Sequence, residues 1–494
     1  MELSVFHGSS IECSENWIVE GIWDGDFQAG NFHKSENFFG SGIRVEGENI
    51  HFVSSMALVD HLFYCMDDEG LYVSNSLVLL LAFTGASLDE THDYFEETMS
   101  IFRGIKRYQK QFKIKHPNIE CFHQVYHENI ILSGRNISLE EKRYSPKSDA
   151  IRSFEEYRDL LSHILKKLEG NYKDPARKFP VSAYSTISSG YDSTAVTCLV
   201  KDIGVKKAFS AKKSESWQRW DPKHRVDDGS LAAKALNIDL CYLDDLALIS
   251  ENELYFLATN YGKTLLRVMP NEVAFHSMCD FIKRSCGVAL VFTGHHGDRV
   301  WDATGTADRY VSEEILRDDL SGLGLCEIRL KSGFIHVPVP FLLCKSIGDL
   351  VKISRSTEMD PWRLHNDYDR PIARRIAEAA GVDRQTFGMT KKRVARRFYQ
   401  LPINHSLRMK FLEYLKDTKG FGFFFAQTYT MMDQTTVFLQ KLMFRIRPRS
   451  SHRKPIGPWA HIDFGFLMWI WATHLLRDRF RQVLLNGGVG KLLR

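Results

Sequence analysis

The 494-residue sequence lacks the cysteine patterns that a disulfide framework or a zinc site would need. Its nine cysteines, an odd number, are scattered and form no CxxC pair and no paired Cys/His spacing. Disulfide-stapled secreted scaffolds and zinc modules are therefore not expected. Scattered single cysteines are typical of reduced thiols, so the sequence predicts a cytoplasmic protein.

Long apolar runs and a large charge of one sign are also missing. The formal net charge of +4 is small for this length, so it neither requires nor excludes nucleic acid. The first residues show no basic stretch followed by an apolar one, and we expect no signal peptide. Residues 464–476 are too short to span a bilayer and contain His474, so we expect a buried helix there and no membrane partner.

The length predicts two domains, and the first, residues 1–145, is expected to be β-rich. Its short apolar runs alternate with turn sequences such as residues 46–49 (EGEN) and 67–70 (DDEG). A helix is expected over residues 76–85. Residues 138–147 are mostly polar and charged, which predicts a linker to the second domain.

Residues 146–494 are expected to form an α/β domain with a doubly wound parallel sheet and a helical tail. Apolar residues at helical spacing predict a first helix over residues 151–168. Apolar strands then alternate with helices, as in a parallel sheet covered on both faces. The expected strands are residues 179–187, 207–210 and 288–293, and the expected helices are residues 192–201 and 229–236.

The strongest functional signal is the loop between the first of these strands and the next helix. Its residues are Ser188, Ser189, Gly190, Tyr191, Asp192 and Ser193. Small residues let backbone N–H groups approach phosphate oxygens, serine hydroxyls can donate to the same oxygens, and a helix N-terminus adds positive potential. Asp192 could cap the helix or, beside a triphosphate, bind Mg²⁺. The GxxxxGK(S/T) spacing is absent, so a Walker-type NTPase is not expected.

A second segment follows the apolar strand at residues 288–293, where ligands bind in open parallel sheets. Its residues include Thr293, Gly294, His295, His296, Asp298 and Arg299. His295 and His296 could be a base and an orienting group, or loop residues without a chemical role. The HxxD spacing of His295 and Asp298 could also indicate a metal site, but no third ligand is evident.

The two segments resemble the SGGxDS pyrophosphate loop and the SGxGxDE segment of the asparagine synthetase family of ATP pyrophosphatases, the PP-loop proteins. The resemblance implies an adenine nucleotide alpha hydrolase-like sheet, with ATP and Mg²⁺ as cofactors. It implies that Asp192 and Asp298 bind Mg²⁺ and that Thr293 and Gly294 lie near the nucleotide. Adenine contacts would come from the strand around Phe209 and Ser210. The chain departs from the pattern at Ser189, His295, His296 and Arg299.

A third segment, residues 368–392, resembles the region that carries an essential lysine in these synthetases. Lys391 fits that position best, and Lys392 is the adjacent alternative. A lysine near the α-phosphate would stabilise the charge on the departing pyrophosphate. Several arginines crowd the same region, so a solvated basic face is the competing interpretation: Arg374, Arg375, Arg384, Arg393, Arg396 and Arg397.

The N-terminal part resembles a degenerate Ntn glutaminase domain. In glutamine-dependent asparagine synthetases the mature chain begins with a nucleophilic cysteine, whereas here Glu2 follows the first methionine and the first cysteine is Cys13. We therefore expect no glutamine hydrolysis. Without that cysteine, the chain more closely resembles β-lactam synthetases and lasso-peptide cyclases, which use an amine already present on the substrate.

The leading hypothesis is an AMP-forming ligase that adenylates a substrate carboxylate and joins it to an amine, with small molecules or peptides as substrates. A homodimer is compatible with the sequence. One alternative is a PP-loop enzyme that modifies a nucleobase or tRNA, with Cys198, Cys279 or Cys286 as sulfur carrier. The main feature that favours nucleic acid is the basic run of residues 445–454, for which a solvated loop is the stronger interpretation. Another alternative is a catalytically weak nucleotide-binding scaffold.

Overall fold

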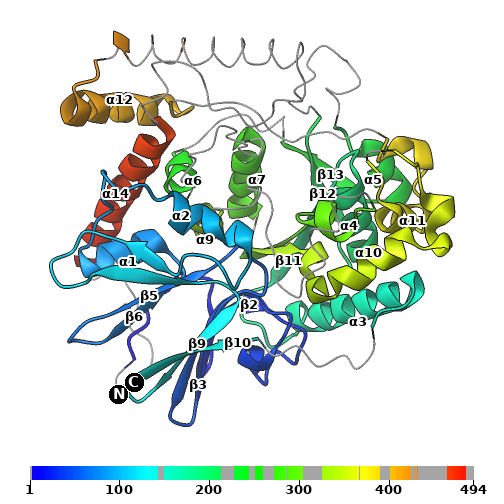
Figure 1. The fold of residues 1–494 in the computed structure, drawn as a ribbon, viewed down its shortest axis with the longest axis horizontal. Helices are drawn as coiled ribbons and strands as arrows, with labels where there is room; N and C mark the ends of the chain where they lie inside the picture. Colours follow the sequence, from blue (N-terminus) through cyan, green and yellow to red (C-terminus); the bar gives the residue numbers. More distant parts are fainter. Residues whose placement is uncertain are drawn as a thin grey trace.

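The computed structural model describes most of the chain (Figure 1). The described residues are 3–142, 150–212, 227–243, 251–259, 272–285, 287–303, 325–366, 368–389, 401–422, 424–425, 428, 431 and 464–485. They contain two antiparallel sheets in the N-terminal part and one parallel sheet in the remainder.

The larger antiparallel sheet has the strand order β1-β2-β3-β4-β9-β10. These strands are Glu12–Cys13, Trp17–Ile22, Phe39–Glu46, Asn49–Val53, Glu128–Ser133 and Asn136–Glu141. The smaller one has the order β6-β5-β8-β7, with strands Leu71–Ser74, Leu62–Met66, Cys121–Val125 and Gln111–Lys113. The predicted turn at residues 46–49 joins β3 to β4, and the one at residues 67–70 joins β5 to β6. The prediction that this part is β-rich is therefore confirmed.

The linker predicted over residues 138–147 is wrong in its first part. Residues 138–141 belong to β10, which pairs antiparallel with β9 along its whole length. β10 is an edge strand, and no residue in it is fully buried. An antiparallel edge strand that faces water carries polar residues, and it therefore resembles a linker in sequence. The rest of the predicted linker, from residue 143, lies outside the described residues.

Helix α1 (Leu77–Thr84) confirms the helix expected over residues 76–85. Ser76 caps it, because its Oγ accepts a hydrogen bond from the backbone N–H of Leu79 at 3.0 Å. Gly85 ends it with φ of 76°, a left-handed conformation that glycine adopts without strain. The other short helices of this part are η1 (Phe32–Lys34), α2 (Phe95–Met99) and η2 (Ser100–Arg103).

The parallel sheet has the order β13-β12-β11-β14-β15, and every neighbouring pair in it is parallel. Its strands are Asp239–Tyr242, Lys207–Ser210, Val181–Thr186, Val288–Thr293 and Phe334–Pro338. β12 and β14 coincide with the predicted strands, and β11 lies within the third. The α/β class is therefore confirmed.

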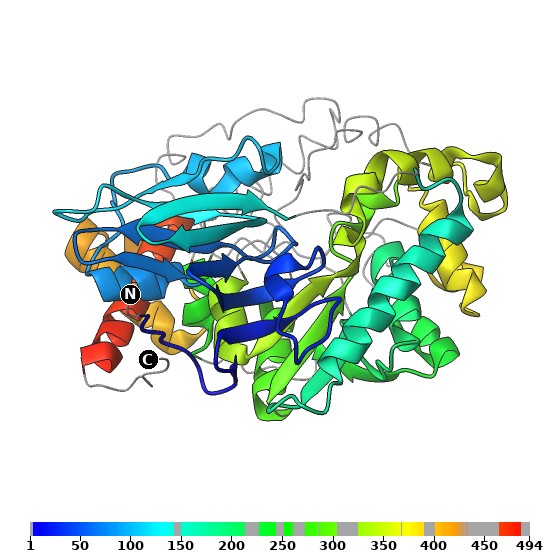
Figure 2. The same ribbon diagram turned by 90° about the horizontal axis from the view of Figure 1, so that it is seen from below.

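Helices cover both faces of the parallel sheet. Because side chains alternate along a strand, β14 sends Leu290 and Phe292 to one face and Ala289 and Val291 to the other. The first face packs against α3 (Phe154–Tyr172), α4 (Tyr191–Lys201), α5 (Ser230–Leu236), α10 (Ile347–Arg355) and α11 (Pro371–Ala379). The second packs against α6 (Glu253–Thr259), α7 (Glu272–Ser285) and α9 (Cys326–Ser332). Figures 1 and 2 show the two sets on opposite sides.

The N-terminal sheets and the parallel sheet share buried contacts across the boundary predicted at residue 145. One apolar core contains Phe39 and Met56 from the first part together with Tyr157 and Leu290 from the second. The guanidinium of Arg329, on α9, pairs with both Asp60 and Glu20 at 2.9 Å. The two regions therefore fold against each other.

Of the expected helical tail, the structure describes α12 (His405–Lys419) and α14 (Phe464–Leu485). α14 confirms the buried helix predicted from residue 464 but continues to Leu485, past the expected end. It packs on α1 and α6, with Trp469 and Ile470 buried against Leu80. Among the described residues, no helix is long and apolar enough to cross a membrane. The remaining short helices are α8 (Gly297–Val300), η6 (Val339–Phe341), η7 (Cys344–Ser346), η8 (Thr357–Trp362) and η9 (Arg384–Thr386).

Candidate functional site

The two segments with the strongest sequence signals meet at one edge of the parallel sheet. β11 and β14 are direct neighbours, with Ser185 paired to Phe292. The loop of residues 187–190 leaves the carboxyl end of β11, and residues 294–296 leave the same end of β14. Open parallel sheets bind ligands at such an edge. The two loops thus leave adjacent strand ends of the parallel sheet.

The loop after β11 is held in a tight conformation by its own hydroxyl groups. The Oγ atoms of Ser188 and Ser193 are 2.8 Å apart, and the backbone N–H of Gly190 donates to Ser188 Oγ at 3.0 Å. The hydroxyl and the backbone N–H of Ser189 both donate to Asp227, at 3.0 and 3.2 Å. Gly190 is the N-cap of α4 in extended geometry, so the first turn of the helix opens directly onto this loop.

Two glycines let the second loop pack against the first turn of α4. A Cβ atom on Gly294 would lie 2.4 Å from the carbonyl carbon of Asp192, and one on Gly297 would lie 2.7 Å from its Cγ. Any side chain at these positions would collide with the helix. Asp298 follows Gly297 directly in α8. The two candidate Mg²⁺ ligands, Asp192 and Asp298, are therefore brought to the same edge.

Arg370, which was given no role from sequence, adds a positive charge at this edge. Its guanidinium forms an ion pair with Asp192, and its side chain is only 5% exposed while that of Asp192 is 21% exposed. Burial alone would lower the pKa of Arg370, but the negative charges of Asp192 and, more weakly, Asp298 outweigh it and raise the pKa. Arg370 stands directly before Pro371, the first residue of α11. A proline suits this first helical position, because its fixed φ angle is that of a helix.

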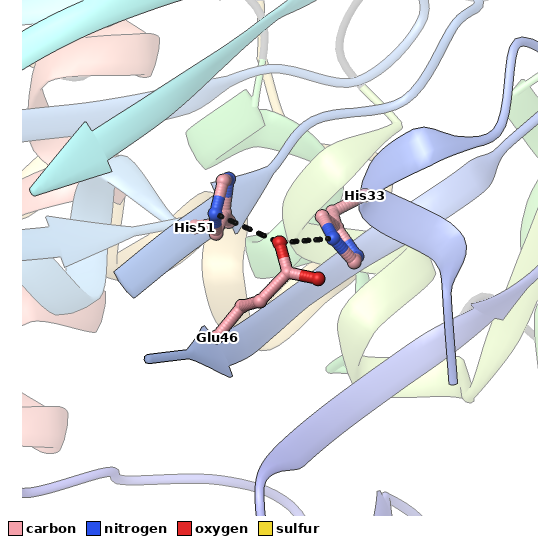
Figure 3. Close-up of side chains that lie close together, drawn as sticks. All are labelled: His33, Glu46 and His51. Carbon is pink, nitrogen blue, oxygen red and sulfur yellow. Dashed lines mark hydrogen bonds and ion pairs between the residues drawn. The ribbon is translucent and has the colours of Figure 1, made fainter. Parts of the chain in front are cut away.

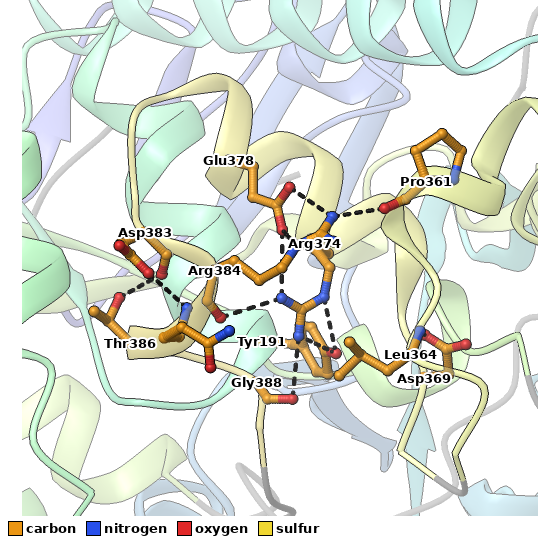
Figure 4. A network of polar contacts seen from close by, with 11 residues as sticks. Tyr191, Pro361, Leu364, Asp369, Arg374, Glu378, Asp383, Arg384, Thr386 and Gly388 are labelled. Atoms are coloured by element: carbon orange, nitrogen blue, oxygen red, sulfur yellow. Dashed lines mark hydrogen bonds and ion pairs between the residues drawn. The ribbon is translucent and has the colours of Figure 1, made fainter.

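The solvated basic face considered for residues 374–397 is wrong for Arg374. Its side chain is fully buried on α11, and its guanidinium donates to the hydroxyl of Tyr191 at 2.6 Å (Figure 4). It also donates to the carbonyl oxygens of Gly388 and Arg384, at 3.4 and 3.3 Å. Arg374 therefore links Tyr191, the first residue of α4, to the segment around Gly388.

Other arginines of the same cluster are paired with acids. Arg375 pairs with Glu155 at 2.6 Å and Glu358 at 2.8 Å, and Arg384 pairs with Glu378 at 2.7 Å. The described arginines thus serve the packing of α11. Lys391, Lys392 and the arginines from residue 393 onward lie outside the described residues.

The histidines of the second loop lie against an aromatic ring. His296 is buried in a left-handed conformation, with φ of 74°, and stacks on Phe341 with ring centroids 4.5 Å apart. His295 stacks on the same ring at 6.1 Å and lies 6.4 Å from His336. The hydroxyl of Thr293 and Nε2 of His336 are 2.7 Å apart. His336, on β15, joins the edge through tertiary contact and was not found from sequence.

The side chains of Ser210 and Phe209, the two residues expected near adenine, are buried inside the protein. Ser210 is 2% exposed, and its hydroxyl accepts a hydrogen bond from the backbone N–H of Gly229 at 3.2 Å. Phe209 is 1% exposed and packs in the core. Neither side chain is therefore exposed for contact with a ligand.

Comparison of the sequence with protein-family models finds no matching family. Comparison with curated proteins finds no match either.

Proposed function

We propose that this chain binds ATP with Mg²⁺ and is an AMP-forming ligase of the PP-loop type. The observation that carries the proposal is the meeting of two loops on adjacent parallel strands, with Gly294 and Gly297 packed on Asp192. In this proposal the parallel sheet is an adenine nucleotide alpha hydrolase-like domain. The two antiparallel sheets of the N-terminal part correspond to a glutaminase-like domain without the nucleophile.

The residues at the edge fit a triphosphate. The loop has the hydroxyls of Ser188, Ser189 and Ser193 and the N-terminus of an 11-residue helix. A phosphate would replace the contacts that these hydroxyls make with one another and with Asp227. A Cβ on Gly190 would meet only Ser188 Oγ at 3.2 Å and the hydroxyl of Tyr368 at 3.7 Å, so the space beside this glycine is open enough for a phosphate oxygen. Arg370 supplies a buried positive charge.

The residues also fit a divalent cation, with Asp192 and Asp298 as its carboxylate ligands. When bound, Mg²⁺ would supply positive charge against the departing pyrophosphate. Arg370 holds Asp192 in place beforehand and can share its charge with the phosphates. The second loop begins after Thr293, the last residue of β14, with Gly294 and His295. In this proposal His295 would orient the substrate or accept a proton.

Lys391 is proposed as the lysine that faces the α-phosphate. The backbone N–H of Gly388 donates to the carbonyl oxygen of Ser189 at 2.8 Å, which ties this segment to the phosphate loop. Lys391 is the third residue after Gly388 in the sequence and itself lies outside the described residues.

In the proposed reaction an oxygen of the substrate carboxylate attacks the α-phosphorus of ATP. The bond from that phosphorus to the bridging oxygen breaks, and pyrophosphate leaves with the electron pair. An amine then attacks the acyl carbon of the adenylate, AMP leaves, and the amine loses a proton as the amide forms. The chain contributes positioning and a fixed arrangement of charge.

The described cysteines do not favour sulfur insertion into a nucleobase or tRNA. Burial raises the pKa of both Cys198 and Cys279 to about 12, so these thiols stay protonated and are poor nucleophiles. Cys286 and the basic run of residues 445–454 lie outside the described residues. A scaffold that binds the nucleotide without turnover would use the same site, and it differs from a ligase in releasing no pyrophosphate.

Isothermal titration calorimetry with a non-hydrolysable ATP analogue, with and without Mg²⁺, tests the proposal. We expect binding that depends on Mg²⁺. A screen for pyrophosphate release with candidate acids and amines follows, and a substrate-dependent signal identifies a ligase. Mg²⁺-dependent binding without release across the screen favours the scaffold, and no nucleotide binding under any condition rejects both.

A further inference from the structure

A second polar cluster lies in the N-terminal part, away from the β11–β14 edge in sequence and on a different sheet. It consists of His33 in η1, Glu46 at the end of β3 and His51 in β4 (Figure 3). One ligand atom from each of the three residues lies within 4.8 Å of the others. It is the one group of three potential metal ligands at this spacing in the part of the chain that the structure describes.

The strand register brings two of these side chains together. Arg44 pairs with His51 and Glu46 pairs with Asn49 across the β3–β4 hairpin. Residues two apart on a strand share a face, so Glu46 and His51 are diagonal neighbours on one face of the sheet. η1 packs on β4 and brings His33 to the side of Glu46 opposite His51 (Figure 3). Its backbone is held there, because the carbonyl oxygen of His33 accepts from Asn129 Nδ2 at 3.1 Å.

Both imidazoles are buried and have unused nitrogen atoms. The side chains of His33 and His51 are 2% and 9% exposed. Within the described residues, Nδ1 of His33 and both ring nitrogens of His51 are buried without a hydrogen-bond partner. A buried polar atom without a hydrogen-bond partner is destabilising, so the unpartnered Nε2 of His51, which faces Glu46, needs an explanation. An ion bound to this nitrogen provides one.

The distances suit a small cation between the three side chains. Oε2 of Glu46 is 3.3 Å from Nε2 of His33 and 4.0 Å from Nε2 of His51. With metal–ligand bonds of about 2.0–2.2 Å, two ligands of a tetrahedral zinc ion lie roughly 3.4 Å apart. Small side-chain rotations would bring the set to that spacing.

The charges around the cluster leave one carboxylate oxygen for an ion. Lys34 Nζ contacts the other oxygen, Oε1, at 2.6 Å, and it is 60% exposed. Arg44 and Glu140 also lie close enough to act on His51.

We propose that His33, Glu46 and His51 form a binding site for a divalent transition metal ion of the zinc class. Two imidazoles and one carboxylate are a ligand set that zinc accepts, with a water molecule in the fourth position. Glu46 is 44% exposed, which leaves that position open to solvent. The ion would fasten η1 to the β3–β4 hairpin and stabilise the larger antiparallel sheet. This site is independent of the proposed ATP site.

The test uses the full chain, purified with a chelator and then given zinc alone. Bound zinc is counted after gel filtration by elemental analysis, and the affinity is measured by calorimetry. The variants are Glu46→Gln and His51→Gln, with Glu48→Gln as the matched control, because Glu48 is an exposed carboxylate in the turn of the same hairpin. Circular dichroism confirms that each variant is folded. Cobalt replaces zinc in a second experiment, to report coordination by its visible absorption.

We expect the wild-type protein and Glu48→Gln to bind one equivalent of zinc more than Glu46→Gln and His51→Gln. The melting temperature should rise with zinc for the first two proteins only. Cobalt should give the absorption of a four-coordinate ion in the wild type and lose it in Glu46→Gln. The proposal is overturned if the wild type takes up no zinc, or if both ligand variants keep the same stoichiometry and affinity as the wild type.

Discussion

Arg370, the residue before α11, forms an ion pair with Asp192 in the first turn of α4. The two residues are far apart in sequence and meet beside the loop that carries Asp298. Two carboxylates against one guanidinium leave a net negative cluster, which a divalent cation would make positive. In the proposed ATP site, a divalent cation alone would therefore change the sign of the charge at this edge and prepare it for the negative triphosphate.

The first prediction concerns the two acids of this cluster. Asp192→Asn and Asp298→Asn should each abolish the Mg²⁺ dependence of ATP-analogue binding, because each removes an anionic ligand of the ion. Both residues are half-buried at the edge of the sheet, so the isosteric change leaves no cavity. Calorimetry at fixed analogue concentration, with and without Mg²⁺, measures the effect.

Asp202→Asn is the matched control, because Asp202 is an exposed carboxylate at the opposite end of α4. It should bind the analogue as the wild type does. If Asp192→Asn keeps full Mg²⁺ dependence, Asp192 does not bind the ion and serves only as the partner of Arg370.

The second prediction concerns the buried contact between Tyr191 and Arg374. Tyr191→Phe removes the hydroxyl that accepts hydrogen bonds from the guanidinium at 2.6 and 3.2 Å. Arg374 is fully buried, so losing this acceptor should lower the free energy of unfolding by about 1–3 kcal/mol. Urea denaturation measures the change.

Tyr64→Phe provides the comparison, since the ring of Tyr64 is half-buried against His123 at 4.8 Å. It should change the free energy of unfolding by no more than about 0.5 kcal/mol. Equal effects of the two substitutions would mean that the Tyr191 hydroxyl contributes nothing specific to anchoring α4.

The sequence predicted those helices and strands whose own residues show a characteristic pattern. β12 and β14 were predicted over the same residues as in the structure, because both are apolar strands buried on two faces. The range predicted for α1, residues 76–85, contains both Ser76, which caps the helix, and Gly85, which ends it. The loops after β11 and β14 were placed at the correct edge for the same reason.

Elements whose character depends on distant partners were missed. β10 is polar because it is an exposed edge strand, and nothing in its own sequence separates it from a linker. Arg374 resembles a surface residue until Tyr191 meets it from another helix. His336 and Arg370 reach the candidate site only through tertiary packing. His33, Glu46 and His51 have no metal-binding spacing in the sequence, and it is the hairpin register that brings them together.

The third prediction is a pH dependence of stability that arises from His474. Its Nε2 accepts a hydrogen bond from the backbone N–H of Leu88 at 3.1 Å. Burial lowers its pKa from 6.5 to about 4, with Arg477 as a further cause, so the folded protein holds the ring neutral. The unfolded chain takes up the proton first as the pH falls. The stability from this residue is thus present above pH 6.5 or so and is lost as the pH falls toward about 4, by up to about 3 kcal/mol.

His474→Gln tests this, because an amide oxygen can accept the same hydrogen bond and does not titrate. The difference in the free energy of unfolding between wild type and variant should change over this pH interval and stay constant above it. Other buried histidines, such as His127, titrate in both proteins and cancel in the difference. A difference that stays the same from pH 7 to pH 4 would show that His474 is not held neutral by the fold.

The last prediction separates the two roles assigned to glycine at the candidate site. Gly294→Ala should lower the free energy of unfolding by about 1–3 kcal/mol, because its Cβ would lie 2.4 Å from the carbonyl carbon and 2.6 Å from the next backbone nitrogen of α4. Gly190→Ala should cost less than Gly294→Ala, about 1 kcal/mol, because its Cβ meets side-chain hydroxyls at 3.2 and 3.7 Å and no backbone atom. Urea denaturation of both variants measures these costs.

Gly190→Ala, although the milder change for stability, should weaken binding of the ATP analogue. Its new methyl group would stand where the loop backbone is proposed to approach the phosphates, so binding should weaken by at least about tenfold, or 1.4 kcal/mol, while the protein remains folded. A stable Gly190→Ala protein that binds the analogue as tightly as the wild type would remove the phosphate role from this loop. A Gly294→Ala protein as stable as the wild type would instead show that the second loop can move off Asp192. The shared edge on which the ligase proposal depends would then not be fixed by packing.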